Sequence, residues 1–192
     1  MDKMKVRGHL RTRAEGLDKG FTKPDKRKHH VNVGPNVKVF PAIVGGRVRV
    51  WHYLTGPWCG EAAKDVYTGV FATALKRHRG EKMRYNIVED NDPSGFKAGV
   101  AVAAKREAKI VPIEFPTYSP DLNPCDYALW TEIENRMAAQ KVPRGEDVDG
   151  YKARLRSTAL AIPAPTVRKM LMDMKPRACE IYERKGGHIH RD

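Results

Sequence analysis

The sequence predicts an α/β fold in which a mixed sheet is flanked by helices. Two β-branched segments surround a Gly-Gly turn, and helical and strand patterns alternate after them. The chain has 192 residues, of which 41% are hydrophobic, and this is enough to bury the core of about one domain. These observations together favour one compact unit with strands between helices.

The first two strands are predicted at residues 37–44 and 47–54, which are rich in β-branched and aromatic side chains. Gly45 and Gly46 between them are typical of a two-residue hairpin turn. Pro41 indicates a weakened strand, an edge strand or a bulge. Alternation in the second strand predicts one face with Val48, Val50 and Leu54, and the opposite face with Arg47, Arg49 and Trp51.

A helix is predicted at residues 60–77, because apolar side chains recur there at intervals of three and four residues. These side chains are Ala63, Val66, Tyr67, Val70, Phe71, Ala74 and Leu75. Gly80 is expected to end the helix. A short strand follows at residues 85–89, and the Ala- and Lys-rich residues 94–109 indicate a second helix.

The second half of the chain is predicted to be mainly helical after one more strand at residues 111–115. A helix at 124–140 begins with Pro, which is favoured at the first helical position. Further helices are expected at 148–160 and 166–185, the last with a kink or break near Pro176.

The charge of the chain indicates a polyanionic partner. It has 36 Lys and Arg against 23 Asp and Glu, a net charge of +13. Nucleic acid is the first candidate and an anionic membrane surface the second, and no apolar run approaches the about 18 residues of a membrane span. We predict a basic arm at residues 1–35, a core at 36–141, and a helical extension of the same domain at 142–192.

The three cysteines are too few and too scattered for a disulfide framework, which indicates a reducing compartment. Cys125 is predicted to be a small buried side chain rather than a nucleophile. Cys179 lies near His188 and His190, but their irregular spacing does not favour a zinc site.

Two acidic residues are candidates for chemistry by their positions. Asp90 follows a predicted strand, at the strand end where open α/β sheets place their sites. Asp126 lies in the first turn of a helix, where free N–H groups favour an ionised carboxylate. If both strands lie in one sheet, the two carboxylates can converge on Mg²⁺ or Mn²⁺, and paired metals catalyse phosphodiester hydrolysis and transfer. An ordinary turn at Asp90 and an ordinary helix start at Asp126 are the structural alternative.

The most specific motif lies at residues 115–130, which read FPTYSPDLNPCDYALW. It resembles the signature of the mariner superfamily of cut-and-paste transposases. Residues 88–95 read VEDNDPSG and resemble the second catalytic block of that family. The 35 residues between Asp90 and Asp126 are close to the family's usual spacing, and the tail at 174–190, MKPRACEIYERKGGHIH, is similar to the family's C-terminus.

The resemblance runs over nearly the whole chain and is greatest to the transposase-like proteins of dinoflagellates and other protists. It implies an RNase H-like fold, a DDE catalytic core within residues 36–141, and Mg²⁺ or Mn²⁺ as the cofactor. Asp90 matches the second acid of the family's triad and Asp126 the third, which implies that both are catalytic metal ligands. Asn91, Asp121 and Asn123 lie in the motifs, and we interpret them as supporting or capping residues.

The first acid of the triad has no clear counterpart in this sequence. In the family it lies on the first strand of the fold, upstream of the hairpin, and none of Asp2, Asp18 and Asp25 lies in such a strand. The helix-turn-helix region that the family places before the catalytic domain is also absent from the sequence. We therefore expect an N-terminally truncated chain whose first strand is missing and whose catalytic core is incomplete.

The leading functional prediction is a transposase-derived DDE domain. Its intact ancestor would cleave DNA strands and transfer them by a two-metal mechanism, and this activity is expected to be impaired here. The alternative is a non-catalytic nucleic-acid-binding module of RNase H-like fold, and a decayed product without function is a third interpretation. We expect DNA as the partner and no binding to a membrane. A homodimer is possible. The family and the basic arm suggest a nuclear location.

Overall fold

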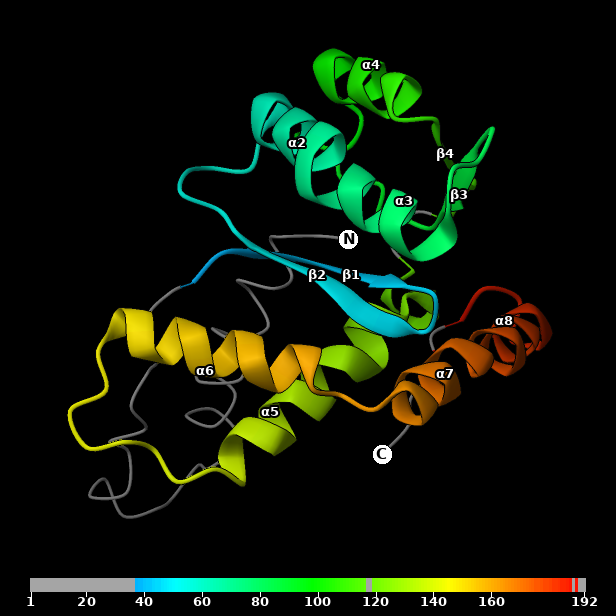
Figure 1. Cartoon of the computed structure of the whole chain (residues 1–192). Helices are drawn as coiled ribbons and strands as arrows, with labels where there is room; N and C mark the ends of the chain where they lie inside the picture. Colours follow the sequence, from blue (N-terminus) through cyan, green and yellow to red (C-terminus); the bar gives the residue numbers. More distant parts are fainter. Residues whose placement is uncertain (1–36, 117–118, 188, 190–192) are drawn as a thin grey trace.

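The computed structural model describes residues 37–116, 119–187 and 189. In Figure 1 the strands β1 (Val39–Val44) and β2 (Arg47–Tyr53) lie between two groups of helices, with α2 (Gly60–Val66), α3 (Ala72–Arg79) and α4 (Gly99–Glu107) on one side, next to β3 (Tyr85–Ile87) and β4 (Ile110–Pro112). On the other side lie α5 (Trp130–Ala138), α6 (Val148–Leu160), α7 (Ala164–Met172) and α8 (Met174–Glu183). The predicted α/β class is confirmed.

The predicted hairpin is confirmed as the antiparallel strands β1 (Val39–Val44) and β2 (Arg47–Tyr53). Gly45 and Gly46 have φ values of 61° and 76°, so both central residues of the turn adopt the left-handed backbone that glycine accepts without strain. The strand register shifts directly after Ala42, next to Pro41, where the sequence indicated a bulge.

The bulge corrects the predicted faces of the second strand. Val50 pairs with Ala42 and Val48 pairs with Ile43, so Arg49 is the extra residue between them. As a result, Val50 joins the core beneath α2–α4, whereas Val48 and Trp51 join the core beneath α5–α7. The prediction that Val48 and Val50 share a face was wrong, because the extra residue reverses the alternation.

The predicted helix at 60–77 is interrupted by a wider turn. Between α2 and α3 lies the π-helical segment η2 (Tyr67–Phe71). The apolar side chains of this stretch are buried as predicted except Val70, which is 40% exposed, because the wide turn rotates it away from the core. Gly80 ends α3 with a φ of 70°, as expected.

The strands β3 (Tyr85–Ile87) and β4 (Ile110–Pro112) form a parallel pair connected through α4. Both strands are shorter than predicted. Ile110 and Tyr85 face each other across the pair and are buried beneath α4. Val111 and Ile113 are 42% and 50% exposed.

The described strands form two pairs, β1 with β2 and β3 with β4, and not one continuous sheet. A cavity of about 310 Å³ lies between the pairs, lined by Ala42 and Val44 of β1 and by Asn86 and Ile87 of β3. No described strand connects the two pairs by hydrogen bonds.

The C-terminal helices pack against the hairpin. Leu129, Ile133, Leu155 and Val167 form a common core with Trp51 of β2. The predicted last helix breaks earlier than expected, at Asp173 between α7 and α8.

The position of Pro176 explains this difference, because it lies in the first turn of α8, where a backbone N–H has no helical acceptor and proline is tolerated. No helix in the described part of the chain is long and apolar enough to cross a membrane. The division into arm, core and extension stays a prediction, and the arm lies outside the described residues.

Candidate metal and nucleic-acid site

Asp90 lies three residues beyond the end of β3, in a half-buried position. The backbone N–H of Asn91 donates a hydrogen bond of 2.7 Å to its Oδ1 atom. The Asn91 side chain in turn donates through Nδ2 to the carbonyl of Phe115, which follows β4. Asn91 therefore connects the segments that follow the two parallel strands, which agrees with its predicted supporting role.

The turn after Asp90 is closed by its own side chains. Asp92 accepts hydrogen bonds from the backbone N–H of Ser94, at 2.9 Å, and from its hydroxyl group, at 2.8 Å. A Cβ on Gly95 would lie 1.8 Å from the indole nitrogen of Trp58, so no other residue fits there without a shift of the packing. The end of this motif is thus explained by packing.

Asp126 lies in the first turn of the segment η4 (Cys125–Leu129), a π-helical turn that leads into α5. Two residues before this segment lies Asn123, which is buried and caps it. Its carbonyl accepts the N–H of Asp126 at 2.8 Å, and its Oδ1 accepts the N–H of Cys125 at 3.1 Å. The predicted capping role of Asn123 is confirmed, and Asp126 occupies the helix start expected for it.

Cys125 is buried, as predicted. Burial raises the pKa of its thiol from 9.0 to about 12, with a small further contribution from the charge of Asp126. The thiol is therefore protonated at neutral pH and acts as a small apolar side chain beside Asp126.

The segments that precede the two acids border the same cavity. Val88 and Glu89, before Asp90, and Asn123 to Cys125, before Asp126, all line the cavity between the strand pairs. Asp90 and Asp126 themselves are not among the residues that line it. Their carboxylates are of the ligand type that Mg²⁺ and Mn²⁺ prefer. Among the described residues, no group of three or more His, Cys, Asp or Glu is placed to hold a metal ion.

A buried polar cluster beside Asp90 was missed by the sequence analysis. The ammonium group of Lys105 pairs with Oε1 of Glu89 and donates a 2.7 Å hydrogen bond to the carbonyl of Phe96. The hydroxyl of Tyr67 donates to the other carboxylate oxygen, Oε2. The side chains of Lys105 and Glu89 are only 5% and 11% exposed.

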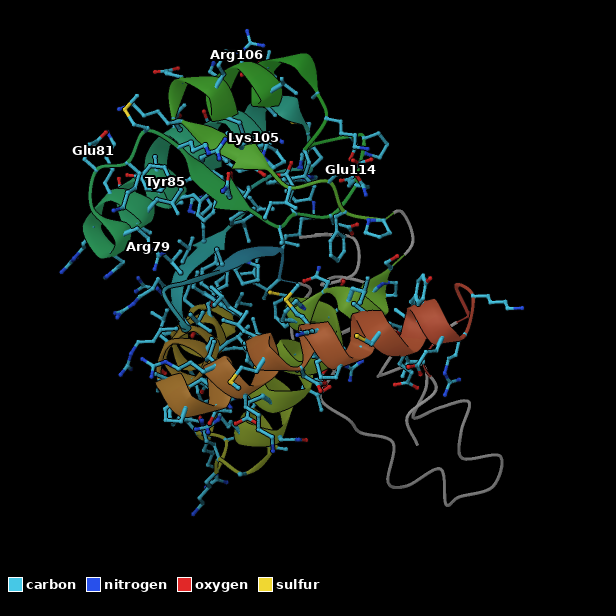
Figure 2. All side chains as sticks on the ribbon, turned by 90° about the vertical axis from the view of Figure 1, so that its right-hand side faces the viewer. Arg79, Glu81, Tyr85, Lys105, Arg106 and Glu114 are labelled. Atoms are coloured by element: carbon cyan, nitrogen blue, oxygen red, sulfur yellow. The ribbon has the colours of Figure 1, made fainter. Side chains whose placement is uncertain are left out.

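Two features of this cluster are informative. Burial, and then the charge of Glu89, raises the pKa of Tyr67 well above its usual value, so its hydroxyl stays a donor. In Figure 2, Lys105 lies on the inner side of α4, whereas the neighbouring Arg106 lies on the outer side. The sequence feature that indicates burial of Lys105 is its position four residues after the buried Ala101, on the same helical face.

A second cluster fixes the motif that precedes Asp126. Arg177 of α8 donates to the carbonyl of Asp121 at 3.3 Å and to the Asp173 carboxylate at 2.6 Å. Its guanidinium group lies 3.8 Å from the ring centroid of Tyr127. The N–H of Ile189 donates to the Asp121 carboxylate at 3.2 Å. Asp121 is therefore held by the C-terminal tail, which agrees with a supporting role.

Exposed arginines gather near the turn of the hairpin and the end of α3. Desolvation, and then the charges of Arg49 and Arg77, lower the pKa of His78 at the end of α3. Arg79, which Figure 2 shows at the end of α3, also lines the cavity between the strand pairs. None of these three arginines forms an ion pair within the described residues, so their charge is available to a polyanion.

Comparison with known proteins identifies similar sequences and structures, although no family model matches the chain. The transposable element Tcb1 transposase of Caenorhabditis briggsae is 28% identical over 151 residues, which cover 74% of this chain. The matched region is 54% of that transposase, so the chain spans about half the length of this curated relative.

The fold is similar to that of the Mos1 mariner transposase catalytic domain. Its crystal structure superposes with a TM-score of 0.70 at 17% identity, over 98% of this chain and 96% of that domain. The same domain with Raltegravir and Mn superposes equally well, and the Mos1 paired-end complex with Mn has a TM-score of 0.67 over 88% of this chain. The Mos1 domain has an RNase H-like fold, so the predicted fold is confirmed.

Proposed function

We propose that this chain, a homologue of the mariner-type transposases, is a DDE domain that binds DNA and uses divalent metal ions. The observation that carries the proposal is that the segments before Asp90 and Asp126 border one cavity. The motifs around both acids are those that resemble the family's catalytic blocks.

Asp90 and Asp126 are the proposed metal ligands. Structures of the Mos1 catalytic domain with Mn and with Mg support the choice of ion. Divalent ions held there would activate water for attack on a phosphodiester and stabilise the leaving oxygen. Asn91 donates to the carbonyl of Phe115 and Asn123 accepts the N–H of Cys125, and these bonds would hold the segments that carry the two carboxylates.

DNA is the proposed partner. The Mos1 paired-end complex with the left transposon end supports this choice, and so does the net charge of +13. The exposed arginines Arg49, Arg77 and Arg79 would contact phosphates, which makes the affinity depend on salt. A homodimer and a nuclear location are part of the same proposal.

We infer that strand cleavage and transfer by this chain are impaired. Asp90 and Asp126 account for two acids of the three in the family's triad, and two carboxylates hold a pair of ions less firmly than three. The second candidate function, a nucleic-acid-binding module without catalysis, is favoured by the arginines, because phosphate binding does not require the acids.

A nicking assay on supercoiled plasmid with Mn²⁺, combined with a DNA-binding assay, tests the proposal. Weak nicking is expected from the natural chain and none from Asp90→Asn or Asp126→Asn, while all three bind DNA. Asp65→Asn, which removes an exposed carboxylate of α2, is the matched control and should nick like the natural chain.

The outcomes separate the two candidate functions. Equal nicking by the natural chain and Asp90→Asn would refute the two-carboxylate site. Salt-dependent DNA binding without nicking by any variant would support the non-catalytic module. If the natural chain neither nicks nor binds DNA, both proposed functions are refuted.

A further inference from the structure

We infer that Glu89, Lys105 and Tyr67 form a positioning network for Asp90, an inference that rests on the metal site proposed above. Glu89 directly precedes Asp90, so the position of its backbone sets where the Asp90 side chain begins. Lys105 approaches Glu89 from α4 and Tyr67 approaches it from η2. The network thus connects two helical segments to the residue before the proposed ligand.

Glu89 is fully engaged in this network. Lys105 pairs with its Oε1 atom and Tyr67 donates to its Oε2 atom. Both carboxylate oxygens therefore have a protein donor, and their carboxylate is compensated by a buried ammonium group. Glu89 is consequently not a competing metal ligand, although it is adjacent to Asp90.

Stability alone does not account for this buried ion pair. Removing two charges from water costs about as much free energy as their attraction returns, so a neutral pair of similar volume is often equally stable. The network instead provides hydrogen bonds of fixed direction, which orient the backbone next to the proposed metal ligand Asp90. Lys105 also binds the carbonyl of Phe96, so it holds both sides of the loop that contains Asp90.

The same strand pair offers a matched comparison. Lys109 and Glu81 form an ion pair of 2.9 Å near the start of β3, at the opposite end from Asp90. Their side chains are 47% and 60% exposed, so water screens the pair. It has the same chemistry as Lys105 and Glu89, but it contacts neither acid segment.

The experiment measures Mn²⁺ affinity of the full chain by electron paramagnetic resonance, and thermal unfolding in parallel. In the double variant Glu89→Gln/Lys105→Met the net charge near Asp90 is unchanged and Tyr67 keeps an acceptor. We expect about tenfold weaker Mn²⁺ binding, the loss typical for residues that orient a metal ligand, with a melting temperature close to that of the natural chain. The control Glu81→Gln/Lys109→Met should bind Mn²⁺ like the natural chain.

The outcomes distinguish this inference from the proposed function. If the natural chain does not bind Mn²⁺, or if Asp90→Asn binds it equally well, the proposed metal site fails. If Asp90→Asn weakens binding but the folded double variant binds like the natural chain, the positioning role is overturned and the metal site stands. Should the double variant not fold, Tyr67→Phe decides, because unchanged affinity in that variant would also overturn the role.

Discussion

At the scale of single residues, the motif around Asp90 combines chemistry with packing. Asp92 closes a turn and Gly95 allows Trp58 to approach the backbone, so these residues serve the shape of the loop. Asp90 instead accepts the N–H of Asn91, and the Asn91 side chain binds the carbonyl of Phe115 after β4. In this motif, which resembles a catalytic block, Asp90 is the one proposed metal ligand, and the other residues shape the loop.

Gly95→Ala should destabilise the chain. The added Cβ would lie 1.8 Å from the indole nitrogen of Trp58, so the ring or the backbone has to move. We expect a loss of about 1–3 kcal/mol in the free energy of unfolding, the usual effect of overpacking a core. Urea denaturation followed by tryptophan fluorescence measures it.

Gly99→Ala is the matched control for this substitution. A Cβ on Gly99 would meet no atom within 4 Å, and alanine favours the helix that begins there. This variant should be as stable as the natural chain or more stable. A similar loss in both variants would contradict the packing explanation for Gly95.

At the scale of elements, one arginine of helix α8 binds the motif that precedes Asp126. Arg177 reaches Asp121, Tyr127 and Asp173, which lie in three different segments. The C-terminal tail therefore supports the turn that leads to the proposed ligand.

Replacement of Arg177 by Met should cost about 2 kcal/mol of unfolding free energy, because a buried guanidinium group with several acceptors is lost. Arg184→Met on the same helix is the control, since Arg184 is half-exposed and pairs with Glu180 at 2.8 Å. That variant should change the free energy by less than about 0.5 kcal/mol. Chemical denaturation of both variants provides the comparison, and equal losses would show that Arg177 has no special role.

At the scale of the whole molecule, the exposed arginines and the proposed ligands lie on different elements, and of the three arginines only Arg79 lines the cavity. The arginine cluster near the hairpin turn includes Arg49 and Arg77, whereas the proposed ligands follow β3 and begin η4. A polyanion could therefore contact this surface without engaging the acids. This separation is the physical reason why binding and catalysis can be tested independently.

The variant Arg49→Gln/Arg77→Gln should reduce the salt dependence of DNA binding. Each lost phosphate contact lowers the slope of log K against log salt by about 0.9. Fluorescence anisotropy with a labelled duplex at several salt concentrations measures the slope. The control Lys64→Gln/Lys152→Gln removes two cations that already pair with Glu61 and Asp149, and its slope should stay near that of the natural chain. If both double variants reduce the slope equally, the arginine cluster is not a specific contact surface.

The sequence by itself determined the α/β class, the hairpin at Gly45–Gly46, most of the helices and the segments that carry Asp90 and Asp126. These features depend on local patterns, because turn residues, apolar periodicity and helix starts act within a few positions of the chain. Homology to the Tcb1 transposase and the Mos1-like fold confirm the family resemblance that the motifs indicated.

Only the tertiary structure decided which faces and partners these segments have. The extra residue Arg49 divided Val48 and Val50 between two cores, and the wide turn at η2 turned Val70 outward. In the sequence, Lys105 does not differ from the many solvated cations, whereas in the structure it is buried against Glu89. The physical reason is that burial and pairing arise from contacts between distant segments, which local periodicity does not encode.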